Sequence, residues 1–241
     1  MLTLYQFRHS TFCLKTRMAL HAKKIIYKVE EVTPGLGQIE IFQISGQKQV
    51  PIILDDNNQV ISDSTKICEY IDNKNDNHKL FPEDPFLLAH AKLIEDWADT
   101  TMAFACKNSL LNASLENNDL RSALLPDEIP QSIKGIVNKL PLQKFGKVSK
   151  AFLNPKSNLE LQKILESLSK ALSKKQFLIN DNLSIADISI AAQLSLLKFP
   201  SSSGQFLEGK GCPEFINNPY LESLFRWRDN LEEYLFSAKN Q

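Results

Sequence analysis

A serine at a junction between a strand and a helix is the first residue of this 241-residue chain whose setting suggests chemistry. The first turn of a helix leaves backbone N–H groups without partners and carries the positive end of the helix dipole. The Ser10 hydroxyl therefore either caps the helix or donates a hydrogen bond to an anionic ligand such as a thiolate. The surrounding segment is Arg8-His9-Ser10-Thr11-Phe12-Cys13-Leu14-Lys15-Thr16-Arg17.

Two later segments have the same kind of setting. In Gln49-Val50-Pro51 the proline opens a strand, and a cis bond before it would turn the Val50 backbone outward to pair with an extended peptide. A trans proline that merely begins a strand is the alternative. Asp63-Ser64 begins another helix, whose first N–H groups can hold a carboxylate while an acidic side chain holds an ammonium; simple capping is again the alternative.

The elements that position these residues change character along the chain. Residues 1–75 alternate between strand and helix signals, which predicts the order β-α-β-(α)-β-β-α. This order implies a parallel βαβ unit followed by an antiparallel hairpin. We expect residues 76–85 to be a linker and residues 86–241 to be all-helical. The predicted strands are 2–7, 25–32, 50–54 and 59–62, and the predicted helices are 10–22, 39–44, 63–73, 86–115, 159–175, 184–198 and 219–236.

The helical part has two features of its own. Ser184-Ile185-Ala186-Asp187 has the form of a capping box, so we expect Ser184 and Asp187 to hold a helix start. Arg226 and Arg228 flank a tryptophan, and we interpret them as lying on solvated faces, with a reach into a substrate pocket as the alternative.

A lysine-rich stretch lies within an insertion expected near 116–157. Residues 131–157 contain six lysines and no acidic residue. The stretch is either a solvated, partly packed insertion, a lid over a substrate pocket, or an amphipathic contact with an anionic membrane or partner. Its lysines are at 134, 139, 144, 147, 150 and 156.

Composition narrows the function classes. The chain has 28 basic and 28 acidic residues, so no global basic field attracts nucleic acid, and 43% hydrophobic content excludes intrinsic disorder as the main state. We find no basic-then-apolar leader and no apolar run long enough to cross a membrane. The four cysteines show no C-x-x-C or zinc spacing, so we expect no metal and a cytoplasmic protein with reduced thiols.

Taken together, the order of these motifs resembles the cytosolic glutathione S-transferase superfamily. Residues 8–17 are similar to the serine motif of bacterial Ser-type members, closest to the zeta and theta classes, and Lys48-Gln49-Val50-Pro51 resembles the zeta segment that holds a cis-proline. Asp63-Ser64 matches a family position that usually has Glu-Ser or Gln-Ser. The resemblance implies an α/β thioredoxin-like N-terminal domain, residues 1–75, followed by an all-α helical bundle domain.

The resemblance also implies a function. Glutathione would bind as co-substrate along Gln49, Val50 and Pro51, with its γ-glutamyl end at Asp63 and Ser64 and its sulfur at Ser10. The expected protein is a homodimeric detoxification transferase whose thiolate attacks a small apolar electrophile. Glutathione-dependent isomerase, peroxidase or thiol-transferase activity is an alternative, and so is a non-catalytic glutathione-fold binding module.

Three further side chains lie close to the implied sulfur position. Tyr5 is an alternative donor, although its strand position favours a core role. Cys13 could form a mixed disulfide with glutathione, but it lies one helical turn further along, where we expect it to be buried and inert. We interpret His9 as solvent-facing or packing, and Ser10 has no evident general base, which makes it a hydrogen-bond donor and not a nucleophile.

Overall fold

A four-stranded mixed sheet forms the first part of the molecule. The computed structural model describes residues 1–33, 37–75, 78–125 and 155–237. The strands lie in the order β2-β1-β3-β4, with β1 and β2 parallel and β3 antiparallel to both of its neighbours. The predicted parallel unit followed by a hairpin is therefore confirmed. The strands are β1 (Leu2–Gln6), β2 (Tyr27–Glu31), β3 (Ile52–Leu54) and β4 (Val60–Ser62).

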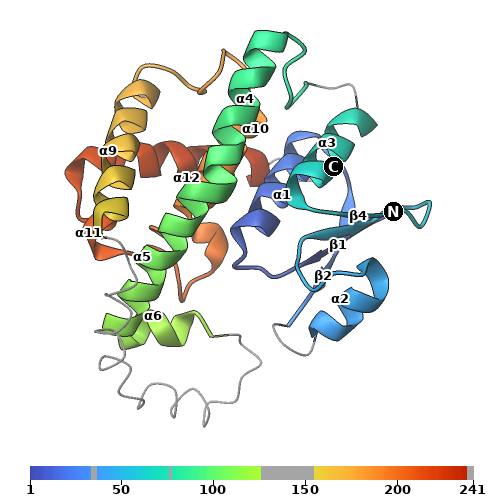
Figure 1. Cartoon of the computed structure of the whole chain (residues 1–241), viewed down its shortest axis with the longest axis horizontal. Coiled ribbons are helices and arrows are strands. Elements are labelled where there is room, and N and C mark those ends of the chain that lie inside the picture. Colours follow the sequence, from blue (N-terminus) through green and yellow to red (C-terminus); the bar gives the residue numbers. More distant parts are fainter. Residues whose placement is uncertain (34–36, 76–77, 126–154, 238–241) are drawn as a thin grey trace. The chain divides into compact units, whose positions relative to one another are not determined.

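Helices cover both faces of this sheet. Figure 1 shows α1 (Thr11–Ala22) and α3 (Ser64–Lys74) together on one side and α2 (Gly37–Ser45) on the other. The alternation along β1 explains the two layers: Leu2 and Leu4 are buried, while Tyr5 packs against the α2 side in a cluster built on Val32, Ile41 and Ile52.

The rest of the described chain is helical. The predicted helix over 86–115 is observed as two helices joined by a π-helical turn at Ala98–Met102. Sequence periodicity did not find the short helices α6 and α11. None of the helices that the structure describes is long and apolar enough to cross a membrane. The helices are α4 (Pro85–Trp97), α5 (Ala103–Glu116), α6 (Asn118–Ala123), α9 (Pro155–Leu172), α10 (Ile185–Leu194), α11 (Pro213–Ile216) and α12 (Glu222–Ser237), with 3-10 turns at Ser201–Ser203 and Pro219–Leu221.

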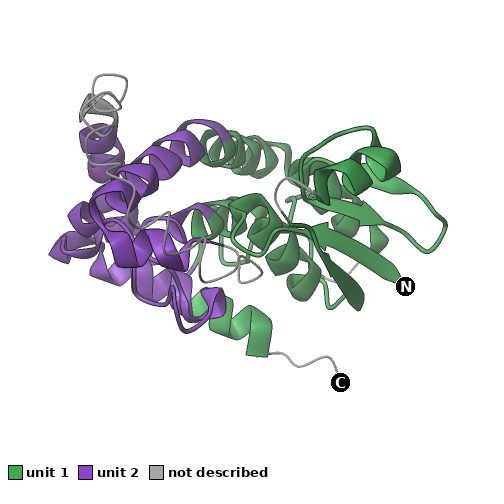
Figure 2. Ribbon diagram, turned by 90° about the horizontal axis from the view of Figure 1, so that it is seen from below, with its two compact units in different colours: residues 1–99, 177–192, 230–241 green, residues 100–176, 193–229 purple. Residues whose placement is uncertain are grey.

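The chain divides into two compact units that do not follow its linear order. Unit 1 is residues 1–99, 177–192 and 230–241, and unit 2 is residues 100–176 and 193–229 (Figure 2). Helix α4, most of α10 and the end of α12 thus belong with the sheet. The domain boundary near 76–85 stays a prediction, and the lysines at 134–150 lie outside the described residues, as does the side chain at 156.

One sequence interpretation is wrong within unit 2. Arg226 is exposed and pairs with Glu222, as expected for a solvated face, but Arg228 is fully buried. Its guanidinium donates to the backbone oxygen of Lys198 at 2.7 Å and to Asp229 at 2.7 Å. An arginine side chain has both an apolar chain and a charged guanidinium, so its presence in the sequence does not tell whether the helix face is buried or exposed.

The carboxylate of Asp187 organises the start of α10 in unit 1. One of its oxygens accepts from the Ser184 N–H at 2.9 Å and from the Ser184 hydroxyl at 2.7 Å, and the other accepts from the Leu178 N–H at 2.7 Å. Burial raises the pKa of Asp187, against the opposing effect of these hydrogen bonds. The N–H of Ile185 donates to the oxygen of Leu80, which ties this helix start to the segment between α3 and α4.

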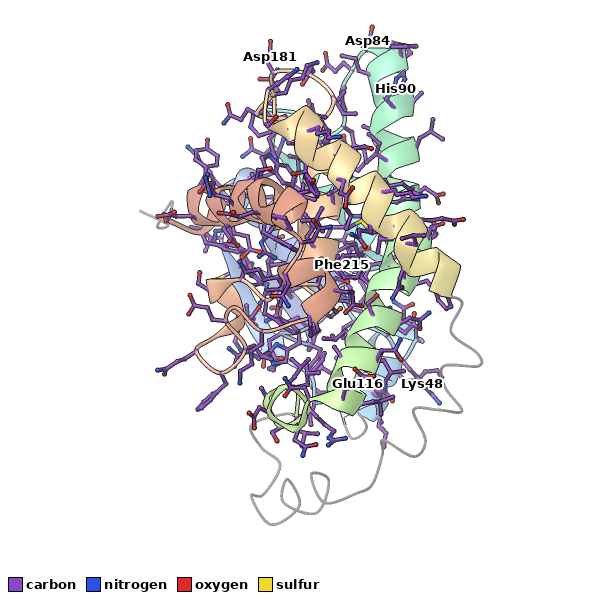
Figure 3. The ribbon with its side chains drawn as sticks, turned by 90° about the vertical axis from the view of Figure 1, so that its left-hand side faces the viewer. Lys48, Asp84, His90, Glu116, Asp181 and Phe215 are labelled. Atoms are coloured by element: carbon purple, nitrogen blue, oxygen red, sulfur yellow. The ribbon has the colours of Figure 1, made fainter. Side chains whose placement is uncertain are left out.

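We expect Asp187→Ala to lower the free energy of unfolding by about 2–4 kcal/mol, because the buried N–H of Ser184 and the partly buried N–H of Leu178 lose their acceptor. Chemical denaturation measures the change. Asp181→Ala is the matched control, since Asp181 is exposed on the loop before this helix (Figure 3) and its loss should be close to neutral. Equal effects of the two substitutions would contradict the capping role.

Candidate functional site

Strand register brings the three candidate segments to one end of the sheet. Tyr5 of β1 lies opposite Ile52 of β3, and Ile52 lies opposite Ser62 of β4. Ser10 follows the end of β1, and Asp63 follows the end of β4. Val50 precedes the start of β3, which runs in the opposite direction to β1 and β4. Pairing thus places the predicted site residues at the ends of neighbouring strands.

Ser10 is the N-cap of α1. Its backbone is extended (φ −77°, ψ 125°), and its Oγ accepts from the Cys13 N–H at 3.4 Å. A hydroxyl that accepts with a lone pair still has its own hydrogen to donate. Ser10 therefore caps the helix, which was one of the two interpretations of the sequence, and its hydroxyl hydrogen is still available to donate to a ligand.

Asp63 and Ser64 begin α3 in the corresponding way. Asp63 is the N-cap, and its Oδ1 accepts from the Lys66 N–H at 3.1 Å. Its backbone has a φ of 78°, which is rare for a residue with a side chain and costs about 1–3 kcal/mol. Such strain is often kept at binding sites. Asp63 is exposed and Ser64 is buried.

The Gln49–Pro51 segment lies next to the sheet. The Val50–Pro51 bond is cis, as the family resemblance implies. Because β3 begins only at Ile52, the Val50 backbone lies outside the β ladder. The Val50 side chain packs against the cluster built on Val32, Ile41 and Ile52, and Gln49 is exposed.

The three accessory residues are placed differently from Ser10. Tyr5 packs on the α2 side of the sheet, which leaves it in a core role. His9 is half-buried, with its ring 5.5 Å from the Phe7 ring in an edge-to-face arrangement. Cys13 is fully buried, and burial raises the pKa of its thiol to about 11, which favours the protonated thiol.

Sequence reasoning missed a buried ion cluster beside these helix starts. The fully buried Lys15 ammonium, on α1, donates to Glu95 and Asp99 at 2.6 Å each and to the hydroxyl of Thr65 at 3.2 Å. Thr65 directly follows Ser64 on α3. The cluster therefore joins the start of α3 and the first half of α1 to the C-terminal end of α4 and the π-helical turn that follows it.

The charge balance of this cluster keeps the lysine protonated. Burial lowers the pKa of Lys15, but its neighbours Cys68, Asp99 and Glu95 outweigh that effect and raise the pKa overall. A sequence signal did exist, because Lys15 lies three and four residues before the buried Met18 and Ala19, on the helix face that packs inward.

Metal-binding chemistry has no visible centre in this part of the molecule. Within the described ranges, no group of three or more His, Cys, Asp or Glu side chains is arranged to hold an ion. The site consists instead of two helix N-termini and a stretch of backbone outside the sheet ladder, which suits an anionic or peptide-like ligand.

These features define a thioredoxin-like domain, here followed by helices: a mixed sheet with this strand order, a cis-proline before β3 and helix starts at one end of the sheet. Residues 4–79 match the family described as glutathione S-transferase, N-terminal domain. This N-terminal part of the chain is thus similar to the glutathione-binding domain of glutathione S-transferases.

Curated relatives match over the first part of the chain. Glutathione S-transferase omega-1 of Sus scrofa is 29% identical over 94 residues, which are 39% of each chain. The enzyme of the same name from Mus musculus is 29% identical over 90 residues, which are 37% of this chain and 38% of the relative. The chain thus matches about two fifths of the length of these relatives.

Solved structures match over nearly the whole chain. A glutathione S-transferase from Rhodospirillum rubrum has a TM-score of 0.64 at 16% identity and covers 100% of this chain and 90% of its own. The beta-etherase LigF from Sphingobium sp. has a TM-score of 0.64 at 22% identity and covers 98% of both. At these identities the likeness establishes the fold.

We expect Lys15→Met to lower the free energy of unfolding by about 3–5 kcal/mol, because two carboxylates would lose their buried counter-charge. Lys92→Met is the control. Lys92 also makes an ion pair, with Glu69 at 3.0 Å, but both partners are about half exposed, so its loss should cost less than about 1 kcal/mol. Denaturant titration of both variants measures the difference, and similar losses would contradict a structural role for the cluster.

Proposed function

We propose that this protein is a glutathione transferase in which Ser10 activates the thiol of bound glutathione. The observation that supports this most is the Ser10 hydroxyl at the N-terminus of α1, which accepts from the helix and keeps its hydrogen for a ligand. An anionic sulfur beside it would receive one hydrogen bond and face the positive end of the helix dipole.

The size of the required effect is modest. A thiol with a pKa of about 8.5 is only about 3% ionised at pH 7. Lowering its pKa by about two units makes roughly three-quarters of it thiolate, which corresponds to about 2.7 kcal/mol of preference for the anion. A hydroxyl donor and a helix terminus together can supply that amount.

The remaining segments would hold the rest of the tripeptide. The Val50 backbone, outside the β ladder, would pair with the extended main chain of glutathione. Ser64 and the first N–H groups of α3 would take the γ-glutamyl carboxylate, and the exposed Asp63 carboxylate would take its ammonium. The thiolate would then attack a small apolar electrophile.

The thiol-transferase alternative has less support. It would use Cys13 as a second nucleophile, whereas burial raises the pKa of that thiol to about 11. Glutathione-dependent isomerisation and peroxide reduction use the same thiolate and differ in the second substrate. A non-catalytic module would bind glutathione without lowering the pKa of its thiol.

Titration of bound glutathione tests the proposal. We expect thiolate absorbance to give a pKa about two units below the free value in the native chain, a value restored toward the free one in Ser10→Ala, and a low value kept in Ser10→Thr, which retains the hydroxyl. Binding without a shift would contradict a catalytic role, and the absence of binding would contradict the glutathione assignment.

We also propose that the protein forms a homodimer, as the family resemblance implies, and that α4 lies in its interface. Phe86 and Leu93 are 71% and 69% exposed. His90, also on α4 (Figure 3), has its ring 4.2 Å from that of Phe86, and the spacing of positions 86, 90 and 93 puts them on one helix face. Leu93→Asp should yield monomers in sedimentation velocity, whereas Ile39→Asp, at a similarly exposed position on α2, should not. A native chain that sediments as a monomer would contradict this proposal.

A further inference from the structure

The turn that leads into Ser10 is held from two sides by opposite charges. Arg8 lies two residues before Ser10, and its backbone N–H donates to the Glu31 carboxylate at 2.6 Å. Its backbone oxygen accepts from the Arg17 guanidinium at 3.3 Å. The backbone of Arg8 is thus bound on its N–H side by the Glu31 carboxylate of β2 and on its C=O side by the Arg17 guanidinium of α1.

Further contacts fix both the turn and the anion. The second Glu31 oxygen accepts from the Gln6 amide at 3.1 Å, and Gln6 is the register partner of Glu31 at the end of the sheet. The turn closes on itself through the Ser10 N–H, which donates to the Phe7 oxygen at 2.9 Å. The Glu31 carboxylate therefore joins the last residue of β1 to the turn that carries Ser10.

We propose that Glu31 and Arg17 are positioning residues that hold the Ser10 turn through Arg8 and act in opposite directions on the ionisation of a thiol bound there. The catalytic meaning of this inference rests on the proposed glutathione transferase function. The geometric part, a two-sided hold on Arg8, does not depend on it.

The opposing electrostatic effects follow from the placement of the two charges. A carboxylate near a thiolate disfavours the anion, and a guanidinium favours it. Both already act on Cys13, whose N–H the Ser10 hydroxyl accepts: after burial and hydrogen bonding, Arg17 lowers and Glu31 raises the pKa of that thiol. His9 and Arg8 are the other titratable or charged side chains of the turn.

Matched controls lie on the same strand. Glu30 and Lys28 form an exposed ion pair on β2 at 2.5 Å. Neighbouring residues of a strand point to opposite faces, so Glu30 does not share the side of Glu31. Glu30→Gln and Lys28→Met therefore remove one charge of each sign from the same strand without touching the hold on Arg8.

The experiment needs no glutathione, because it measures the pKa of a thiol introduced into the protein at position 10. In a Ser10→Cys, Cys13→Ala background, which avoids a dithiol pair at positions 10 and 13, the pH dependence of alkylation by iodoacetamide reports the pKa of the thiol at position 10. The other native cysteines do not interfere, because all three are buried and burial raises the pKa of Cys68 to about 12. Amide hydrogen exchange at Arg8, followed by NMR, reports the hold itself.

We expect Glu31→Gln to lower the pKa at position 10 by about half a unit and Arg17→Met to raise it by a similar amount, the size of one unit charge acting near a half-exposed site. Arg17→Lys should leave the pKa close to that of the background. Arg8 amide exchange should accelerate several-fold in Glu31→Ala, which loses the acceptor, and much less in Glu31→Gln, which keeps one.

Two results would overturn the proposal. One is an unchanged pKa at position 10 together with unchanged Arg8 exchange in the Glu31 variants. The other is a pKa shift in Glu30→Gln as large as that in Glu31→Gln, with one in Lys28→Met as large as that in Arg17→Met, because such shifts would indicate only a long-range electrostatic field. If Arg17→Met does not fold, the Glu31 variants and Arg17→Lys still decide. Shifts at position 10 together with an unshifted pKa of glutathione bound to the native chain would support the hold on Arg8 and reject the proposed function.

Discussion

A lysine ammonium that cannot reach water determines how three helices of unit 1 meet. Burying a charge is costly unless it is paired, and Lys15 gains two carboxylates and a hydroxyl only where α1, the start of α3 and the end of α4 come together. Ser10 and Ser64 stand at the first turns of α1 and α3. An ion cluster that contains neither residue thus links the two helices that carry the ends of the candidate site.

A second buried lysine holds the same two helices at their other ends. Lys23, which caps α1, is 3.0 Å from the Asp72 carboxylate near the end of α3. Asp72 also accepts the N–H groups of Leu80 and Phe81, where the chain has left the sheet layer. Both ends of the α1–α3 pair are thus linked by buried ions, whereas the turn that leads into Ser10 is held by Glu31 and Arg17.

How far the sequence predicts this molecule depends on the range of the interactions involved. Local signals were sufficient for the strand and helix order of residues 1–75, for the Ser10 and Asp63 caps and for the Asp187 box, because a cap needs only residues three positions apart. The partners of Lys15 are 50 to 84 residues away along the chain, and those of Glu31 are 23 and 25 away. No local pattern specifies such pairs, and Arg228 shows the same limit in unit 2.

The pairing of Ser10 with Cys13 constrains what kind of nucleophile the site can use. In a dithiol site the residue at the helix start attacks and the residue three positions on resolves the disulfide. Here a hydroxyl occupies the first position, and burial holds the second thiol protonated, with a pKa of about 11. The helix dipole, the turn and its two opposing charges remain. Under the proposed function, the reacting sulfur must therefore come from the ligand. The reactivity of the site then depends on the pKa of that ligand thiol. Glu31 and Arg17 would shift this pKa through their charges without contacting the sulfur.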